Sequence, residues 1–261
     1  MDIKEQFPEV HHIWDGAISF VYEVHPHIVV KVPRCEDSME RFQNELKIYD
    51  ILSRHPPCPQ LVQPFYYTDK GIFLEYMPDE SLAERIQLNH IKDRETWVVT
   101  KWMNDMAQAA AFFESLAHGD IRAENILLQG DRIKLTDLDL AGDIGSPCEF
   151  IFSPSGRALS AHDEEQGLGT RGTGGRLGAR TEQSALASFF YYINYGFEPW
   201  ENRRLMSVSR DRVINQMEKQ ENMEFPELNG DPIIDALIDK CWHNRYATVR
   251  EERRQTRSSP H

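Results

Sequence analysis

Apolar and polar positions alternate in the first third of the chain in the way that is typical of short β-strands. The segment ISFVYEV at 18–24 has a large apolar side chain at every second position, and the run IVVKVP follows at 28–33 after a His-Pro-His turn. Two such runs joined by a short turn predict a β-hairpin. The runs LVQPFYYT at 61–68 and GIFLEYM at 71–77 predict two further strands joined by a turn.

The rest of the chain has the three-to-four spacing of apolar residues that is typical of amphipathic helices. Residues 36–54 have this spacing at Phe42, Tyr49 and Leu52, with Glu45 on the same stripe. We expect an α+β fold, in which a small sheet with one helix precedes a larger, mainly helical part and a polar tail. The pattern predicts further helices at 94–117, 182–196, 203–221 and 232–243, a hairpin at 126–137, an irregular stretch at 138–181 and the tail at 252–261.

Composition narrows the class of partner. The chain has 261 residues and a formal net charge of -13, which argues against a nucleic-acid partner and against binding to an anionic membrane surface. The longest apolar stretch, 185–197, is too short and too interrupted to cross a bilayer, and the N-terminus lacks the apolar core of a signal peptide. The four cysteines form no paired motif, so we expect reduced thiols in a cytoplasmic or nuclear protein.

Polar residues converge at the open end of the predicted hairpin. The segments ILL and IKLT flank a Gly130-Asp131 turn, so an antiparallel pairing centred on this turn places Asn125 opposite Thr136, with Asp137 beside it. Amide and carboxylate oxygens at about 5 Å separation suit Mg²⁺, which commonly uses one or two protein oxygens together with substrate phosphates. Asp120 lies on the loop that enters this site, where a free carboxylate could accept a proton from an attacking hydroxyl.

Lys31 and Glu45 are charged residues in apolar surroundings. Lys31 lies between two valines of a predicted strand, and Glu45 lies on the apolar stripe of the predicted helix 36–54. Because an unpaired buried charge is costly, we predict an ion pair between them. The lysine would then point its remaining donors at an anion such as a nucleotide phosphate.

These residues resemble the motifs of the eukaryotic protein kinase superfamily. HGDIRAEN at 118–125 resembles the catalytic loop, LTDLD at 135–139 the metal-binding segment, and VVKVP the strand of the phosphate-binding lysine. LEYMPDESL at 74–82 resembles the hinge, and Glu182 stands where the long C-lobe helix usually has an aspartate. The resemblance spans 12–251. The sequence is most similar in style to short kinase-like proteins of filamentous fungi.

The resemblance implies a bilobal fold and an ATP-dependent phosphotransferase. The N-lobe would span 12–77, the hinge 78–82 and the C-lobe 83–251, with ATP and Mg²⁺ as cofactors, a protein as substrate, and a monomeric chain. The implied roles are the following: Lys31 contacts the phosphates, Glu45 holds Lys31, Asp120 is the catalytic base, Arg122 faces the γ-phosphate, Asn125 and Asp137 bind Mg²⁺, and Gly16, Val29, Glu75 and Met77 belong to the nucleotide-binding surface.

Several positions depart from the family pattern. DGAISFVYEV keeps only Gly16 of the glycine-rich loop, and Leu138 and Asp139 replace the usual phenylalanine and glycine. Gly119 replaces the arginine that docks a phosphorylated loop, which implies that activity does not wait on loop phosphorylation. A protein serine/threonine kinase is the first hypothesis. A pseudokinase scaffold and a small-molecule kinase of the aminoglycoside- or choline-kinase type are the alternatives.

One further motif is interpreted as a loop. The residues at 167–172 spell GxGxxG, but a phosphate-binding loop of that kind must follow a strand and open a helix. The preceding ALSAHDEEQ is not a strand pattern, so we expect no phosphate cradle there.

Overall fold

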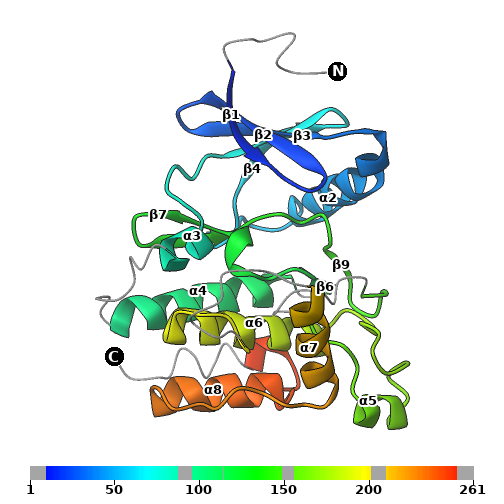
Figure 1. The fold of residues 1–261 in the computed structure, drawn as a ribbon. Helices are drawn as coiled ribbons and strands as arrows, with labels where there is room; N and C mark the ends of the chain where they lie inside the picture. The colour runs from blue at the N-terminus through cyan, green and yellow to red at the C-terminus, as the bar shows by residue number, and fades with distance from the viewer. Residues whose placement is uncertain (1–9, 88–95, 114, 149–155, 201–209, 252–261) are drawn as a thin grey trace.

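An antiparallel sheet with one long helix beside it lies above a larger set of helices in the computed structural model (Figure 1). The structure describes residues 10–87, 96–113, 115–148, 156–200 and 210–251. This arrangement of a β-rich N-terminal part and a mainly helical C-terminal part confirms the predicted α+β, bilobal fold. In the described residues, no helix has the length and apolar character that crossing a membrane requires.

The N-terminal sheet has five strands in the order β1-β2-β3-β5-β4, and every neighbouring pair is antiparallel. The predicted strands are present, with one further strand, β1, before them. Lys31 in β3 pairs with Val21 on one side and Ile72 on the other, so it sits in the middle of the sheet. The strands are β1 (His11–Asp15), β2 (Ser19–His25), β3 (Ile28–Pro33), β4 (Pro64–Thr68) and β5 (Gly71–Glu75).

The helix expected at 36–54 begins as a short 3-10 turn, η1 (Glu36–Ser38), and continues as α2 (Met39–Leu52). Its buried stripe contains Phe42, Ile48 and Tyr49, and also Glu45, whose exposed fraction is 0%. A carboxylate on the apolar stripe of a helix requires a buried partner. α2 therefore presents an acid to the interior of the molecule.

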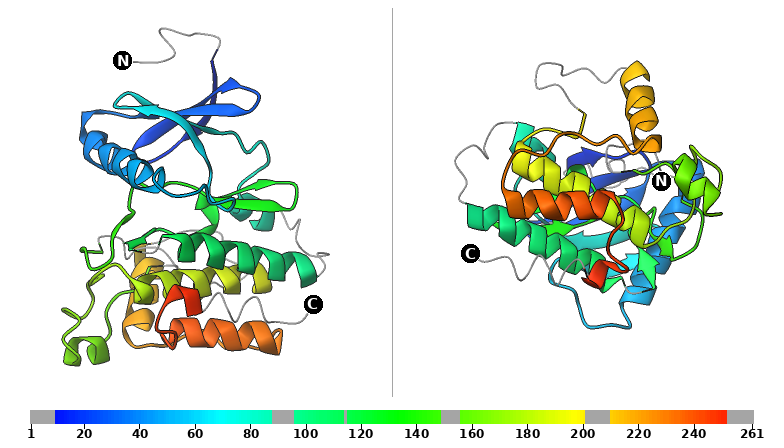
Figure 2. Two further views of the ribbon diagram at one scale, coloured as in Figure 1. Left: turned by 180° about the vertical axis from the view of Figure 1, so that it is seen from behind. Right: turned by 90° about the horizontal axis from the view of Figure 1, so that it is seen from below.

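The C-terminal part is built around α6, of which residues 180–193 are all buried. Residues 185–193 of this helix are mostly apolar, whereas residues 180–184 are polar or charged although they are buried. α4, α6 and α8 run side by side (Figure 2). The helices and strands of this part are α3 (Leu82–Gln87), α4 (Thr96–Phe112), β6 (Leu116–Ala117), η2 (Ala123–Asn125), β7 (Ile126–Gln129), β8 (Arg132–Leu135), β9 (Gly142–Asp143), α5 (Ala161–Glu165), α6 (Ala179–Tyr195), α7 (Arg210–Glu221) and α8 (Pro232–Trp242).

The predicted β7–β8 hairpin has the expected register. Ile126 pairs with Leu135, and the Thr136 backbone N–H donates to the Asn125 carbonyl at 2.9 Å. The hairpin also joins the two parts of the molecule, because the Val62 N–H donates to the Leu135 carbonyl and the Leu135 N–H to the Gln60 carbonyl, each at 2.9 Å. The open end of the hairpin is thereby held beneath the sheet.

Some boundaries differ from the predicted ones. The helix expected at 94–117 is described over 96–112, and the stretch expected to be irregular contains α5. α5 begins with a capping box, in which the Asp163 N–H donates to the Ser160 hydroxyl and the Ser160 N–H donates to the Asp163 carboxylate. This local signal is not revealed by apolar spacing. The GxGxxG segment at 167–172 follows α5 and not a strand, as expected. The start of the helix expected at 203–221 and the polar tail lie outside the described residues.

Candidate active site

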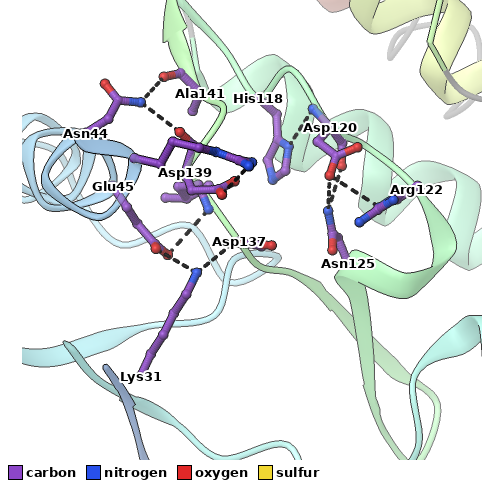
Figure 3. A network of polar contacts seen from close by, with 12 residues as sticks. Lys31, Asn44, Glu45, His118, Asp120, Arg122, Asn125, Asp137, Asp139 and Ala141 are labelled. Carbon is purple, nitrogen blue, oxygen red and sulfur yellow. Dashed lines mark hydrogen bonds and ion pairs between the residues drawn. The ribbon is translucent and has the colours of Figure 1, made fainter. Parts of the chain in front are cut away.

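The Lys31 side chain joins two carboxylates that come from distant parts of the chain. Its Nζ lies 2.6 Å from Glu45 Oε2 on α2 and 2.5 Å from Asp137 Oδ1, just after β8. The predicted Lys31–Glu45 ion pair is therefore present, with Asp137 as an additional partner (Figure 3). Burial alone would lower the pKa of Lys31, but the two carboxylates outweigh it and keep the pKa above its usual value.

Asp137 has a left-handed backbone, with φ of 67°. This conformation is uncommon outside glycine, although aspartate and asparagine tolerate it better than other residues. Burial raises the pKa of its carboxyl group, but Lys31 outweighs that effect and the net pKa is lowered, so Asp137 is an anion at neutral pH. His118 and Arg122 also lower this pKa, which places Asp137 within electrostatic reach of the loop at 118–125.

A second polar group surrounds Asp120. Asn125 Nδ2 donates to Asp120 Oδ2 at 2.8 Å and to its backbone carbonyl at 3.0 Å, and Arg122 Nε lies 3.2 Å from the same Oδ2 (Figure 3). Asp120 Oδ1 is buried and has no hydrogen-bond partner among the described residues. Burial raises the pKa of Asp120 to about 6, against the opposing effects of Arg122 and Asn125. The arrangement leaves one carboxylate oxygen without a donor from the described residues.

The backbone of this loop is held from behind by Glu182 of α6. Its two oxygens accept from the His118 N–H at 2.9 Å and the Gly119 N–H at 3.1 Å. Gly119 has a φ of +79°, and a Cβ there would lie 2.6 Å from the Leu140 carbonyl oxygen, so any larger residue would force the loop to move. Glu182, which stands where the family usually has the shorter aspartate, thus hydrogen-bonds directly to the backbone of the loop.

His118 braces the same loop as a neutral imidazole. Burial lowers its pKa to about 4. Nε2 lies 3.1 Å from the Thr136 carbonyl, which can only accept, so Nε2 carries the proton. Nδ1 then accepts from the Asp120 N–H at 3.3 Å. His118 therefore links the loop that carries Asp120 to the end of the β7–β8 hairpin.

The Glu182 carboxyl provides a test of this bracing through the pH dependence of stability. Burial raises its pKa from 4.5 to about 7, so between these values the folded chain binds a proton that the unfolded chain has lost, and stability falls as the pH rises. The unfolding free energy of the wild type, relative to Glu182→Gln, should therefore decrease by roughly 3 kcal/mol across this range. Urea titrations at pH 4 to 8 measure it, and a difference that is constant with pH would contradict the burial of this group.

Three residues that the sequence did not single out as partners connect α2 to the segment after β8. Asn44 Nδ2 donates to the carbonyls of Asp139 at 3.0 Å and Ala141 at 2.8 Å, and Arg41 Nη2 lies 2.6 Å from Asp139 Oδ2. Arg41, Asn44 and Glu45 have the spacing of one helix face, which is the signal that the sequence offered. Asp139 was noted only as a departure from the family pattern.

The other predicted nucleotide-binding residues lie outside these two polar groups. Gly16 is in a tight β1–β2 turn, where its N–H donates to the Ser19 carbonyl at 2.8 Å. The Glu75 carboxylate pairs with Lys134 Nζ at 2.5 Å, so its side chain is occupied within the protein. Val29 and Met77 are buried, and Val29 precedes Lys31 by two positions, on the same face of β3.

The donor set is compatible with Mg²⁺ that arrives with a phosphate ligand. The Asn125 amide nitrogen is engaged by Asp120, which leaves its amide oxygen, and Asp137 is ionised. These two hard oxygen donors suit Mg²⁺ when phosphate oxygens and waters complete the shell. Over the described ranges, no group of three or more His, Cys, Asp or Glu side chains could hold a metal ion.

Comparison with known families agrees with this geometry. The family model described as the protein kinase domain matches residues 10–159, which contain both polar groups except for Glu182. The comparison with curated proteins gave no match. Because the family model covers more than half of the chain and the fold has the two expected parts, the chain belongs to the protein kinase family.

Proposed function

We propose that the protein is an active Mg²⁺-dependent protein serine/threonine kinase, which transfers the γ-phosphate of ATP to a protein hydroxyl. The observation that carries this proposal is the unpartnered, buried Asp120 Oδ1, held in place by Asn125 and Arg122 on the other oxygen. A positioned carboxylate with a raised pKa is suited to accept a hydroxyl proton. The choice of serine or threonine as acceptor follows the resemblance noted in the sequence.

In this proposal, ATP lies between the N-lobe at 12–77 and the C-lobe at 83–251, with 78–82 as the hinge. The Glu75 carbonyl and the Met77 backbone face the adenine. The Glu75 side chain is paired with Lys134, and the Glu75 N–H donates to the Gln63 carbonyl at 2.9 Å. Val29 lies against the base, and the turn at Gly16 lies near the phosphates.

Lys31 contacts the α- and β-phosphates, and Glu45 keeps it in place from α2. Asn125 and Asp137 would hold Mg²⁺, which neutralises charge on the phosphates. Asp120 orients the acceptor hydroxyl and takes its proton as the phosphoryl group moves, and the Arg122 charge stabilises the γ-phosphate. Lys31 must share its donors between Asp137 and the nucleotide, because both carboxylates already contact it.

A pseudokinase scaffold is the second candidate. The β1–β2 turn supports it, because the Gly16 N–H and Ser19 carbonyl close the turn, and Arg34 Nη1 donates to the Gly16 carbonyl at 3.0 Å. A turn closed in this way offers fewer backbone donors to phosphates than a glycine-rich loop. Such a protein would bind a partner without turnover. A cytoplasmic or nuclear location, a monomeric state and the likeness to short fungal kinase-like proteins remain predictions.

Nucleotide turnover by the purified chain tests the proposal. With Mg²⁺ and a generic protein substrate, the wild type should release ADP and label the substrate, and ATP with Mg²⁺ should raise its melting temperature. Lys31→Ala should lose that nucleotide-induced rise, measured from its own baseline. The matched control is Lys101→Ala, since Lys101 is ion-paired with Asp105 on α4, away from both polar groups. Absence of turnover and of any nucleotide-induced rise in the wild type would refute the proposal.

A further inference from the structure

The structure assigns to Arg41, Asn44 and Asp139 the role of an internal clamp, which positions Lys31 and Asp137 by holding α2 against residues 137–141. This inference rests on the proposed function, because it names positioning residues for the same reaction. The clamp consists only of the chain's own side chains and carbonyls. It therefore predicts that the Lys31–Glu45 pair stays assembled without a phosphorylated loop of the kind that kinases dock on the arginine replaced here by Gly119.

The contacts of the clamp come from one face of α2. Asn44 and Glu45 lie three and four positions after Arg41, and Asn44 faces Asp139 and Ala141 (Figure 3). Glu45 Oε1 accepts from the Leu138 N–H at 3.4 Å, while Glu45 Oε2 pairs with Lys31. A rotation or outward shift of α2 would therefore break the clamp and the Lys31–Glu45 pair together.

Asp139 is the residue on which the clamp depends. It is only 4% exposed, and its carboxylate would be a buried charge without Arg41, because Oδ1 has no partner among the described residues. Removal of Arg41, whose own side chain is 41% exposed, would leave the buried Asp139 carboxylate uncompensated, which favours the paired arrangement. Asp139 also follows Asp137 by two residues, so fixing its carboxylate and carbonyl limits the backbone of Asp137.

Asn44 adds a contact that does not depend on charge. Its amide nitrogen donates to both the Asp139 and the Ala141 carbonyl, so it spans the segment on either side of Leu140. In the same part of the molecule, Gly119 has no side chain with which to dock a loop phosphate. The clamp therefore holds residues 137–141 in place against α2, as a docked phosphate would otherwise do.

Amide hydrogen exchange tests the clamp without relying on activity. In Arg41→Gln, exchange at residues 42–49 and 138–141 should rise by about tenfold, with no rise in α6. Arg54→Gln is the matched control, because Arg54 pairs with Asp50 at the exposed end of the same helix and should leave exchange unchanged. In Arg41→Gln combined with Asp139→Asn, the rise should not exceed that of the larger single change, since the two residues act as one pair.

Turnover measured on the same proteins shows whether the clamp serves the reaction. Arg41→Gln should lower kcat/KM for ATP by about tenfold, Arg41→Lys should restore part of it, and phosphatase treatment of the wild type should change nothing. Unchanged exchange and turnover in Arg41→Gln, exchange that rises equally in α6, or a large loss after phosphatase treatment would each overturn the clamp. A wild type without turnover would refute the kinase proposal alone, because the exchange measurement still tests the clamp.

Discussion

Asp120→Asn is expected to lower phosphoryl transfer by about two orders of magnitude while nucleotide binding stays nearly intact. Asparagine can keep its oxygen at the Oδ2 position, where Asn125 donates and Arg122 lies 3.2 Å away, and place its nitrogen at the unpartnered Oδ1 position. The loop therefore keeps its shape but loses the oxygen that would take the hydroxyl proton. In a loose phosphoryl-transfer step, this group acts on the acceptor and contributes little to holding ATP.

Single-turnover transfer and nucleotide-induced thermal shifts, measured together, separate the two effects. Asp143→Asn is the matched control, since Asp143 is an exposed aspartate on β9. Turnover that survives Asp120→Asn unchanged would show that another group is the base. In a pseudokinase, neither protein would turn over, and partner binding would be indifferent to the change.

Asp137→Asn should impair nucleotide binding as well as transfer, because it removes a proposed metal ligand. We expect the Mg²⁺-dependent part of nucleotide binding to be lost and transfer to fall by about two orders of magnitude or more. Asparagine also tolerates the left-handed backbone at this position, so the fold should persist. In the absence of Mg²⁺, ATP should bind the variant at least as well as the wild type, because a negative charge near the phosphates has been removed.

Thermal shifts with ATP, with and without Mg²⁺, measure this difference, and the Asp143→Asn chain again serves as control. A variant that keeps the full Mg²⁺ dependence of nucleotide binding would exclude Asp137 as a metal ligand. The two aspartates are thus distinguished by the step that each change impairs.

Local patterns in the sequence predicted much of the fold. The four strands from 18 to 77 and the helix after β3 follow from apolar runs and helical spacing. β2, β3, β5 and α2 contain buried residues, whereas β4 contains none. The β7–β8 register could be predicted because a two-residue turn with Gly130 in the left-handed region leaves little freedom in the pairing. α5 was missed because five residues held by a capping box carry no apolar period.

The same reasoning predicted part of the candidate site. The Lys31–Glu45 pair was predictable because two charged residues stood at buried positions and each needed a partner. Asn125 and Thr136 met as the hairpin register required. In both cases, the contact could be predicted from a short segment of the sequence or from the burial of a single charged residue.

By itself, the sequence determined the strands and the helix from 18 to 54, the turn at Gly130 and the need of Lys31 and Glu45 for a partner, because these follow from neighbours along the chain. Only the tertiary structure decided which partner each charge finds. Lys31 meets Asp137 across 106 positions, Asn44 meets the Asp139 carbonyl across 95, and Glu182 meets the His118 backbone across 64. With 42 acidic residues in the chain, a lysine or arginine has many possible partners. The choice is made by the packing of β3, α2 and α6 around the hairpin, since a pairing gains free energy only where that packing excludes water.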